Sequence, residues 1–194
     1  LVERNPETKD FVLDYPKYKG LEEIDISKDV MKGEIPHFLQ WDERWGYETY
    51  GSDFLAVTGC GPTCLSMVTC GLTGDMQWNP YEVAKMAEDN GYYVDGSGSS
   101  WALMSSGAEK LGLTVSSVIF DAEHIRATLE SGQPIICVMG PGDFTNAGHF
   151  LVLTGVDKNG DIILQDPNSV KRTKQHWDVQ KLMNQMKNLW SYRV

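Results

Sequence analysis

Helix signals and strand signals occupy different parts of this sequence. Helical patterns begin at the turn-rich segment GCGPT (residues 59–63) and continue to about residue 132, whereas short runs of β-branched and apolar residues become frequent after residue 113. Helices that come first and strands that come later favour an antiparallel sheet with helices packed on it, rather than alternating βαβ units. We therefore expect an α+β fold, with a helical half at about residues 60–112 and a sheet half at about 114–194.

Four helices are predicted from capping residues at their starts, glycines after their ends, and apolar residues three and four positions apart. They are expected at residues 62–71, with Pro62 at the first position, between Asn79 and Gly91, between Ser99 or Ser100 and Gly112, and between Asp121 and Gly132. A last helix is expected at residues 178–187. This prediction places Cys60 just before the first helix, where unpaired backbone N–H groups gather.

The predicted strands are short apolar runs rich in β-branched residues. They cover residues 114–120, 134–139, 149–156, 162–165 and 189–194. The sequence Asp157-Lys158-Asn159-Gly160 between two of these runs is typical of a hairpin turn. The runs at 149–156 and 162–165 are therefore expected to pair with each other.

The chain of 194 residues is long enough for one domain with a substantial core and short for two. Residues 1–33 are polar, are interrupted by two prolines, and show no sustained periodicity. We expect them to form an extension, with a short strand at about residues 11–13, that packs against a domain formed by residues 34–194.

The charge of the chain argues against two classes of partner. Its formal net charge is −10, and most of the negative charge lies in residues 51–156. Binding to nucleic acid or to an anionic membrane needs a cationic surface, so neither partner is expected. The acidic segment is interpreted as a solvated surface, with a preference for cationic substrates as the alternative. No apolar run approaches the roughly 20 residues that a bilayer requires, so no transmembrane segment is expected.

Cys60 is the best candidate for chemistry among the four cysteines. It lies between Gly59 and Gly61 at the start of a predicted helix, where the helix dipole stabilises a thiolate. The two glycines leave room for a substrate backbone. The alternative is a buried cysteine in a glycine-rich turn. Cys64 and Cys70 fall inside the predicted helix and are interpreted as small buried hydrophobes.

Cysteine spacing also bears on metal binding. Cys60, Cys64 and Cys70 lack the Cys-x2-Cys pairs of common structural zinc sites. A chain of this length needs no disulfide framework. We therefore expect free thiols, including Cys137, with no metal and no cofactor.

A thiolate nucleophile needs a base, and His149 is the best placed of the four histidines. It stands at the start of a predicted apolar strand, which would hold its backbone and leave the imidazole at a rim. His124 and His176 lie in charged stretches and are interpreted as surface residues. A purely structural histidine is the alternative for His149.

The predicted hairpin relates His149 to Asp166. With a two- or four-residue loop, Asp166 faces Leu153 or Leu151 and shares a sheet face with His149. In the four-residue case the two are diagonal neighbours, and the carboxylate can hold the imidazole. A three-residue loop would place them on opposite faces. The alternative for Asp166 is an ordinary Asp-Pro turn that ends a strand.

Several segments occur in an order that resembles the papain-like cysteine peptidases of the bacteriocin-processing type, in particular their stand-alone C39-like branch. They are Gln40, GCGPTCLSMV at 59–68, GHFLVLTG at 148–155 and QDPNS at 165–169, and GSGSSW at 96–101 and PGDF at 141–144 also resemble that branch. The resemblance covers residues 34–194. It implies a papain-like fold, in which a helix that begins at the nucleophile packs against an antiparallel sheet that carries the histidine and the acid.

By this resemblance Cys60 is the nucleophile, His149 the general base, and Asp166 the residue that orients the imidazole, with Asn168 as a rival for that role. Gln40 donates its side-chain amide to the oxyanion hole beside the Cys60 backbone N–H. The substrate-binding candidates are Gly59, Gly61, Trp101 and Gly148. The aromatic residues between Trp41 and Tyr50, together with Trp101, are expected to line a cleft between the two halves.

The resemblance implies a thiol hydrolase that cleaves peptide or amide bonds in a peptide or protein substrate. The alternatives are a cell-wall amidase or transpeptidase on the same fold, and a peptide-binding module without turnover. The bacteriocin processors are fused to a transporter and recognise a double-glycine leader, and neither property is carried over. We expect a bacterial extracellular or cell-surface protein whose signal peptide precedes Leu1, although free thiols suit the cytoplasm equally. Cys64 is interpreted as a buried thiol, with a disulfide to Cys60 as the alternative.

Overall fold

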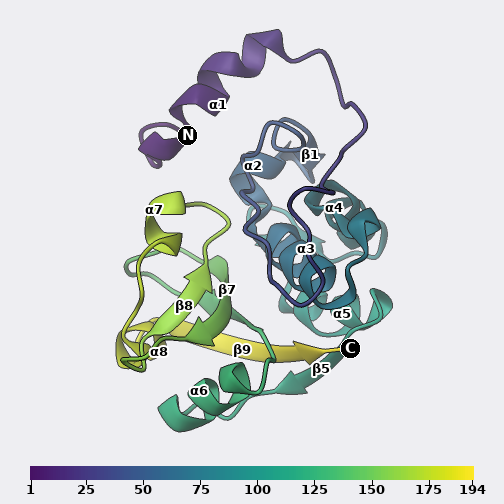
Figure 1. The fold of residues 1–194 in the computed structure, drawn as a ribbon. Coiled ribbons are helices and arrows are strands. Elements are labelled where there is room, and N and C mark those ends of the chain that lie inside the picture. Colours follow the sequence, from purple (N-terminus) through teal and green to yellow (C-terminus); the bar gives the residue numbers. More distant parts are fainter.

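The structure, a computed structural model, describes all of residues 1–194 and divides them into a helical half and a sheet half (Figure 1). Helices dominate between residues 55 and 110, and a five-stranded antiparallel sheet is built from the chain after residue 113. This order confirms the predicted α+β arrangement. None of the helices is both long and apolar enough to cross a lipid bilayer.

Helix α3 (Cys60–Thr73) is the centre of the helical half. All its residues from Gly61 to Gly71 are buried, because α4 (Pro80–Asp89) and the sheet pack around it. It begins two residues earlier than predicted, so Cys60 is its first residue. The short helix α2 (Leu55–Thr58) ends immediately before it, with only Gly59 between the two. Cys60 therefore follows an almost continuous helical stretch rather than an open turn.

The other helices of this half follow their predicted caps, with one exception. At the start of α4, the Asn79 side chain accepts hydrogen bonds from the N–H groups of Tyr81 and Glu82. The helix predicted after Ser100 is split into a 3-10 turn, η4 (Trp101–Met104), and α5 (Ser106–Lys110). Its interruption is at Ser105, whose ψ of −90° is not helical. A 3-10 turn, η3 (Met76–Trp78), and two short hairpins complete this half: β1 (Thr49–Tyr50) with β2 (Asp53–Phe54), and β3 (Tyr93–Val94) with β4 (Gly98–Ser99).

The sheet has the strand order β5-β9-β6-β7-β8, and all neighbours are antiparallel. Its strands are β5 (Thr114–Ser117), β6 (Ile135–Met139), β7 (His149–Val156), β8 (Ile162–Gln165) and β9 (Met186–Arg193). The strand expected at 114–120 ends at Ser117, and β9 begins earlier than the expected residue 189. The helix expected at 178–187 is correspondingly short, α8 (Val179–Met183).

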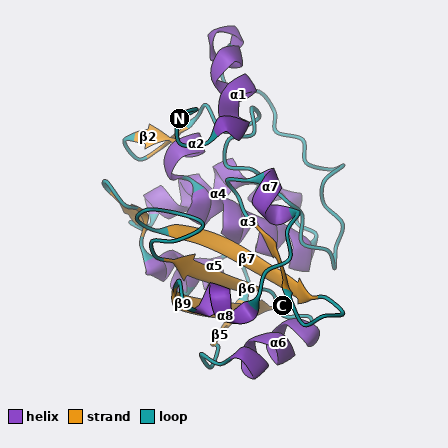
Figure 2. Cartoon of the chain, turned by 90° about the vertical axis from the view of Figure 1, so that its left-hand side faces the viewer, coloured by secondary structure: helices purple, strands orange, loops and turns teal.

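The two faces of the sheet belong to two hydrophobic cores. Ile136, Phe150 and Val152 face the core shared with α3 and α4. Cys137 and Leu151 face a smaller core, which α6 (Ala122–Glu130) and α8 cover from the other side (Figure 2). Because both faces are covered, every residue of β6 is buried. A register error of one residue would therefore be costly on both faces.

The loop of the hairpin between β7 and β8 contains five residues, 157–161, rather than the expected two or four. Next to the loop, Val156 pairs with Ile162. A three-residue loop would give this same register. If this register continued along both strands, His149 and Asp166 would lie on opposite faces of the sheet.

A β-bulge at Thr154 corrects the register. Beyond it Val152 pairs with Gln165, and the same register brings Asp166 opposite Leu151. This is the arrangement predicted for a four-residue loop, in which the first residue of β7 is the diagonal neighbour of Asp166.

The N-terminal extension is helical where a strand was predicted. It contains the 3-10 turn η1 (Pro6–Thr8), helix α1 (Lys9–Asp14) and the 3-10 turn η2 (Tyr15–Lys17). The expectation of a strand at residues 11–13 is wrong, because Asn5 caps the first turn by accepting a hydrogen bond from the Glu7 N–H (3.2 Å) and Pro6 suits its first position. Figures 1 and 2 both show α1 at the end of the molecule that also carries α2 and the short helix α7 (Val170–Thr173).

Candidate active site

Cys60 is partly exposed at the start of α3, and the two glycines beside it are buried. A Cβ atom at residue 59 would lie 2.4 Å from the Leu55 carbonyl oxygen, and one at residue 61 would lie 2.5 Å from the Ser99 hydroxyl oxygen. The space that these glycines leave is therefore filled by α2 and β4. This corrects the expectation that Gly59 and Gly61 leave room for a substrate.

His149 and Asp166 are in direct contact. The Nε2 atom of His149 lies 2.7 Å from Oδ1 of Asp166, and both side chains are buried. This contact uses Nε2, so Nδ1 of the imidazole takes no part in it. The arrangement agrees with the predicted diagonal pair on one face of the sheet.

The Cys60 thiol and the His149 imidazole shift each other's pKa. Burial alone would raise the pKa of Cys60, but a hydrogen bond and the charge of His149, with backbone contributions from Phe150 and Gly61, hold it below its ordinary value. Burial would lower the pKa of His149, but the charge and hydrogen bond of Asp166, together with Cys60, raise it well above its ordinary value. Both directions favour a thiolate beside an imidazolium.

The other three cysteines behave in the opposite way. Burial raises the pKa of Cys64 and of Cys137 well above the ordinary value for a thiol, and raises the pKa of Cys70 to about 12. All three thiols are free. Cys60 is therefore the one thiol that is both partly exposed and biased towards its nucleophilic form.

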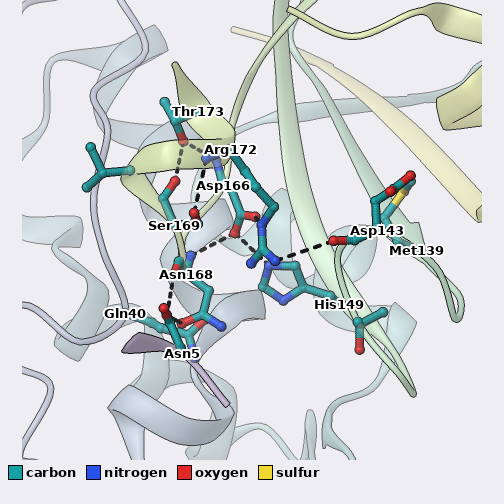
Figure 3. A network of polar contacts seen from close by, with 12 residues as sticks. Asn5, Gln40, Met139, Asp143, His149, Asp166, Asn168, Ser169, Arg172 and Thr173 are labelled. Carbon is teal, nitrogen blue, oxygen red and sulfur yellow. Dashed lines mark hydrogen bonds and ion pairs between the residues drawn. The ribbon is translucent and has the colours of Figure 1, made fainter. Parts of the chain in front are cut away.

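Asp166 is fully buried, and its carboxylate accepts three hydrogen bonds (Figure 3). Besides His149, Oδ1 accepts a hydrogen bond from the Asn168 N–H (2.8 Å), while Oδ2 accepts one from Nε of Arg172 (2.6 Å). Burial would raise the pKa of Asp166, but the charges of His149 and Arg172 hold it below its ordinary value. Sequence analysis missed Arg172, because it lies in a basic stretch that resembles ordinary surface.

The backbone around Asp166 is held by two more side chains that the sequence did not single out. The Asp166 N–H donates to Oγ1 of Thr173 (2.9 Å), and Nε2 of His37 lies 2.7 Å from the Asp166 carbonyl oxygen. His37 precedes Asp166 by 129 residues, so no local spacing relates the two. The acid is thus fixed through its backbone as well as through its carboxylate.

Asn168, the rival to Asp166, points elsewhere. Its side-chain oxygen accepts a hydrogen bond from Asn5 (3.0 Å), and its carbonyl accepts bonds from Asn5 and from the indole of Trp41. Only its backbone N–H reaches the carboxylate of Asp166. The residue in contact with His149 is therefore Asp166.

Gln40 is buried between α2 and the segment that follows β8. Its Nε2 atom lies 2.9 Å from the Ala56 carbonyl oxygen and 3.3 Å from that of Val57, while its Oε1 atom has no partner. In a continuous helix those two carbonyls would accept the N–H groups of Cys60 and Gly61. Because Gln40 donates to both carbonyls, these carbonyls do not compete for the backbone N–H groups of Cys60 and Gly61 beside the thiol.

Most of the aromatic residues expected to line a cleft are core residues instead. Trp45 and Tyr50 have no exposed surface, and Tyr47 is 6% exposed. Their polar atoms are satisfied inside the protein, for example by a hydrogen bond between the hydroxyls of Tyr50 and Ser99, or by one from the Tyr47 hydroxyl to the Phe11 carbonyl. This corrects the prediction for the segment after Trp41.

Two of the substrate-binding candidates lie on the surface. Trp101 is 47% exposed and packs against Trp190 in a T-shaped arrangement, and Gly148 is exposed next to His149. His124 and His176 are exposed and paired with Asp121 and Asp157, as predicted for surface residues. No group of three His, Cys, Asp or Glu side chains is arranged to hold a metal ion.

Comparisons with known proteins bear on the family and the fold of this chain. Residues 32–194 match the sequence model of the Peptidase_C39 like family. The peptidase domain of Streptococcus ComA, described as a bi-functional ABC transporter involved in a quorum sensing pathway, is 18% identical, with a TM-score of 0.51 over 70% of this chain and 90% of that one. A putative C39-like peptidase from Bacillus anthracis is 17% identical, with a TM-score of 0.49 over 85% of this chain and 97% of that one. No curated protein matches the chain. The family match and the likeness to the ComA domain identify the fold as papain-like.

Proposed function

Since this chain belongs to the C39-like peptidase family, we propose that it is a cysteine peptidase in which Cys60 attacks the scissile peptide bond and His149 and Asp166 complete the triad. The observation that carries the proposal is the buried contact of 2.7 Å between His149 and Asp166. It fixes the imidazole through Nε2 and leaves Nδ1 free of the carboxylate, and a hydrogen bond and the charge of His149 help to lower the pKa of the Cys60 thiol.

The first half of the reaction forms an acyl-enzyme. The Cys60 thiolate adds to the carbonyl carbon of the substrate, which forms a carbon–sulfur bond and places a negative charge on the carbonyl oxygen. The His149 imidazolium then donates its Nδ1 proton to the leaving amine as the carbon–nitrogen bond breaks. The products of this half are a free amine and a thioester on Cys60.

The second half hydrolyses the thioester. Neutral His149 takes a proton from a water molecule, the resulting hydroxide adds to the thioester carbonyl, and the thiolate leaves as the carboxylic acid forms. Asp166 holds Nε2 throughout, and stabilises the imidazolium each time it forms. Arg172 and the Asn168 N–H keep Asp166 in its ionised form.

Gln40 and the backbone N–H of Cys60 are the proposed donors to the oxyanion. The Gln40 amide has two hydrogens, and the contact of Nε2 with Val57 (3.3 Å) is longer than the one with Ala56 (2.9 Å). Both hydrogens point at these carbonyls in the free protein, so we propose that the hydrogen of the longer contact turns from Val57 to the oxyanion when substrate binds, while the shorter contact with Ala56 anchors the side chain. Loss of one such donor typically lowers the rate by about 10²–10³-fold.

The test combines labelling with turnover. Substoichiometric iodoacetamide at pH 6, followed by peptide mapping, should alkylate Cys60 and leave the buried thiols of Cys64, Cys70 and Cys137 unmodified. A peptide library should be cleaved by the wild-type chain and left intact by Cys60→Ala. Labelling spread evenly over the four cysteines, or cleavage that survives in Cys60→Ala, would contradict the proposal.

A further inference from the structure

The N-terminal extension contacts the segment that carries Asp166 through two polar side chains. The Asn5 amide donates to the carbonyl oxygen (2.6 Å) and to the side-chain oxygen (3.0 Å) of Asn168. The Glu7 carboxylate accepts hydrogen bonds from the N–H groups of Val170 (2.9 Å) and Lys171 (3.3 Å). It also accepts one from the Ser169 hydroxyl. Figure 3 shows the contact of Asn5 with Asn168.

These contacts fix the short helix that presents Arg172. Helix α7 has only four residues, so its first N–H groups have no partners within the helix. Glu7 supplies acceptors for two of them from a distant part of the chain, and Oγ of Ser169 accepts the Arg172 N–H (3.0 Å). Arg172 in turn holds Asp166 through the bond of 2.6 Å to Oδ2. A chain of direct contacts therefore runs from Glu7 to the acid of the triad.

The same extension is anchored on the helical half. Phe11 stacks on Tyr47 with ring centroids 4.2 Å apart, and the Tyr47 hydroxyl donates to the Phe11 carbonyl (2.7 Å). Phe11, Tyr47 and Ala56 form one small hydrophobic cluster, and Ala56 is the residue whose carbonyl anchors Gln40. The segment between Glu7 and Phe11 thus ties the proposed oxyanion side of the site to the Asp166 side.

We propose that Glu7, assisted by Asn5, is a positioning residue of the active site, which keeps Arg172 on Asp166 and through them keeps His149 aligned with Cys60. The inference rests on the proposed function. Glu7 touches neither substrate nor reacting atoms, so its effect is expected in the alignment of the imidazole. Residues 1–31 lie outside the family match, so this positioning device is an addition to the segment that defines the family.

The test uses Glu7→Ala in the chain of residues 1–194, with Glu3→Gln as the control. Glu3 is an exposed acid of the same extension and makes no hydrogen bond through its side chain. In Glu7→Ala we expect kcat for a cleavable peptide to fall about tenfold with KM unchanged, because small misplacements of a catalytic group are costly. We also expect the pH profile of Cys60 alkylation to shift to higher pH. Glu3→Gln should match the wild type, and Glu7→Gln, which keeps one acceptor oxygen, should fall between.

A role in stability alone would give a different pattern. It would lower the melting temperature of Glu7→Ala without moving kcat or the alkylation profile of the folded protein. That result, or kinetics equal to the wild type, would overturn the inference while the proposed function stands.

A second readout does not depend on turnover. The titration of the His149 imidazole, followed by NMR and assigned with His149→Gln, should move towards the ordinary histidine value in Glu7→Ala because the Asp166 carboxylate is no longer held in place. If the wild-type chain cleaves no peptide, the proposed function fails, and this titration still decides the inference. An unchanged titration would overturn it.

Discussion

Asp166 shows how a single buried charge can organise a site. A carboxylate without exposed surface is stable only when hydrogen bonds and an opposite charge replace its lost hydration. Here His149, Arg172 and a backbone N–H do so, and the two oxygens are divided between the histidine and the arginine. The carboxylate is thereby kept ionised, which is the state that can raise the pKa of His149.

The pH dependence of turnover should report on this arrangement. In the proposed mechanism the active state has Cys60 deprotonated and His149 protonated, so kcat/KM should fall on the acid side as the thiolate gains a proton and on the alkaline side as the imidazolium loses one. In Asp166→Asn the charge that raises the pKa of His149 is lost, so the alkaline limb should move to lower pH and the acid limb to higher pH. Activity at neutral pH should fall about tenfold or more.

The control for this prediction is Asp10→Asn, an exposed acid of α1. It should give the wild-type profile of kcat/KM against pH. Because the thiol and the imidazole titrate as a coupled pair, the two limbs are properties of the pair and not of one residue. An alkaline limb that stays in place in Asp166→Asn would contradict the assignment of Asp166.

Sequence patterns identified site residues at the ends of helices and strands. They missed residues that reach the site only because distant parts of the chain fold together. Cys60 at a helix start and His149 at a strand start both carry local signals. Arg172 and His37 carry none, because a basic stretch is usually solvated surface and a histidine 129 residues from its partner has no periodic relation to it. Both residues contact Asp166 only because the fold brings their segments next to it.

At the level of elements, caps were the reliable signal and boundaries were not. Asn79 and Asp121 start helices as predicted, because each side chain accepts N–H groups of the first turn. The hairpin was predicted with the wrong loop length. Its final register agreed with the prediction for a four-residue loop, because the extra residue of β7 at the bulge offsets the fifth residue of the loop. Burial on both faces of the sheet, which local turn signals do not report, selects that register.

The contact between α3 and β4 gives a prediction at this scale. In Gly61→Ala the new Cβ would lie 2.5 Å from the hydroxyl oxygen and 2.9 Å from the Cβ of Ser99. Such overpacking should destabilise the protein by about 1–3 kcal/mol in urea unfolding. In the double variant Gly61→Ala/Ser99→Gly the clash is removed, so the two substitutions should cost less together than the sum of the single ones.

The control for this prediction is Gly155→Ala, because a Cβ there would meet its nearest neighbour, Ile163, at an ordinary 3.7 Å. Relative to the wild type, Gly155→Ala should change the free energy of unfolding less than Gly61→Ala does. If the free-energy changes of Gly61→Ala and Ser99→Gly simply add in the double variant, the new Cβ at residue 61 does not clash with the Ser99 side chain.

For the whole molecule, the division into a helical half and a sheet half was predictable, since each half repeats its own pattern many times. The path of the N-terminal extension was not. Its polar contacts with the Asp166 segment join residues separated by more than 160 positions, such as Glu7 and Val170, and its own pattern is too irregular to indicate a partner. The family match begins at residue 32, and the division into a domain at residues 34–194 and an extension at residues 1–33 stays a prediction.

The anchoring of the extension can be measured directly. Phe11 is 6% exposed and stacks on Tyr47, whereas Leu13 on the same helix is 61% exposed. Phe11→Ala should lower the free energy for opening α1 by about 3 kcal/mol, so that its amide hydrogens exchange roughly 100-fold faster. Leu13→Ala should leave the exchange unchanged. Equal exchange rates in the two variants would show that the extension is held mainly by its polar contacts.

The bulge at Thr154 separates the hairpin loop from the site. Between the bulge and the strand ends, the register is set by side chains buried on both faces, so the five residues 157–161 do not determine where His149 meets Asp166. The loop can therefore lose or gain residues without passing a displacement on to the imidazole. It is a place where an added peptide or a reporter group could be carried by this chain while the reacting groups keep their alignment.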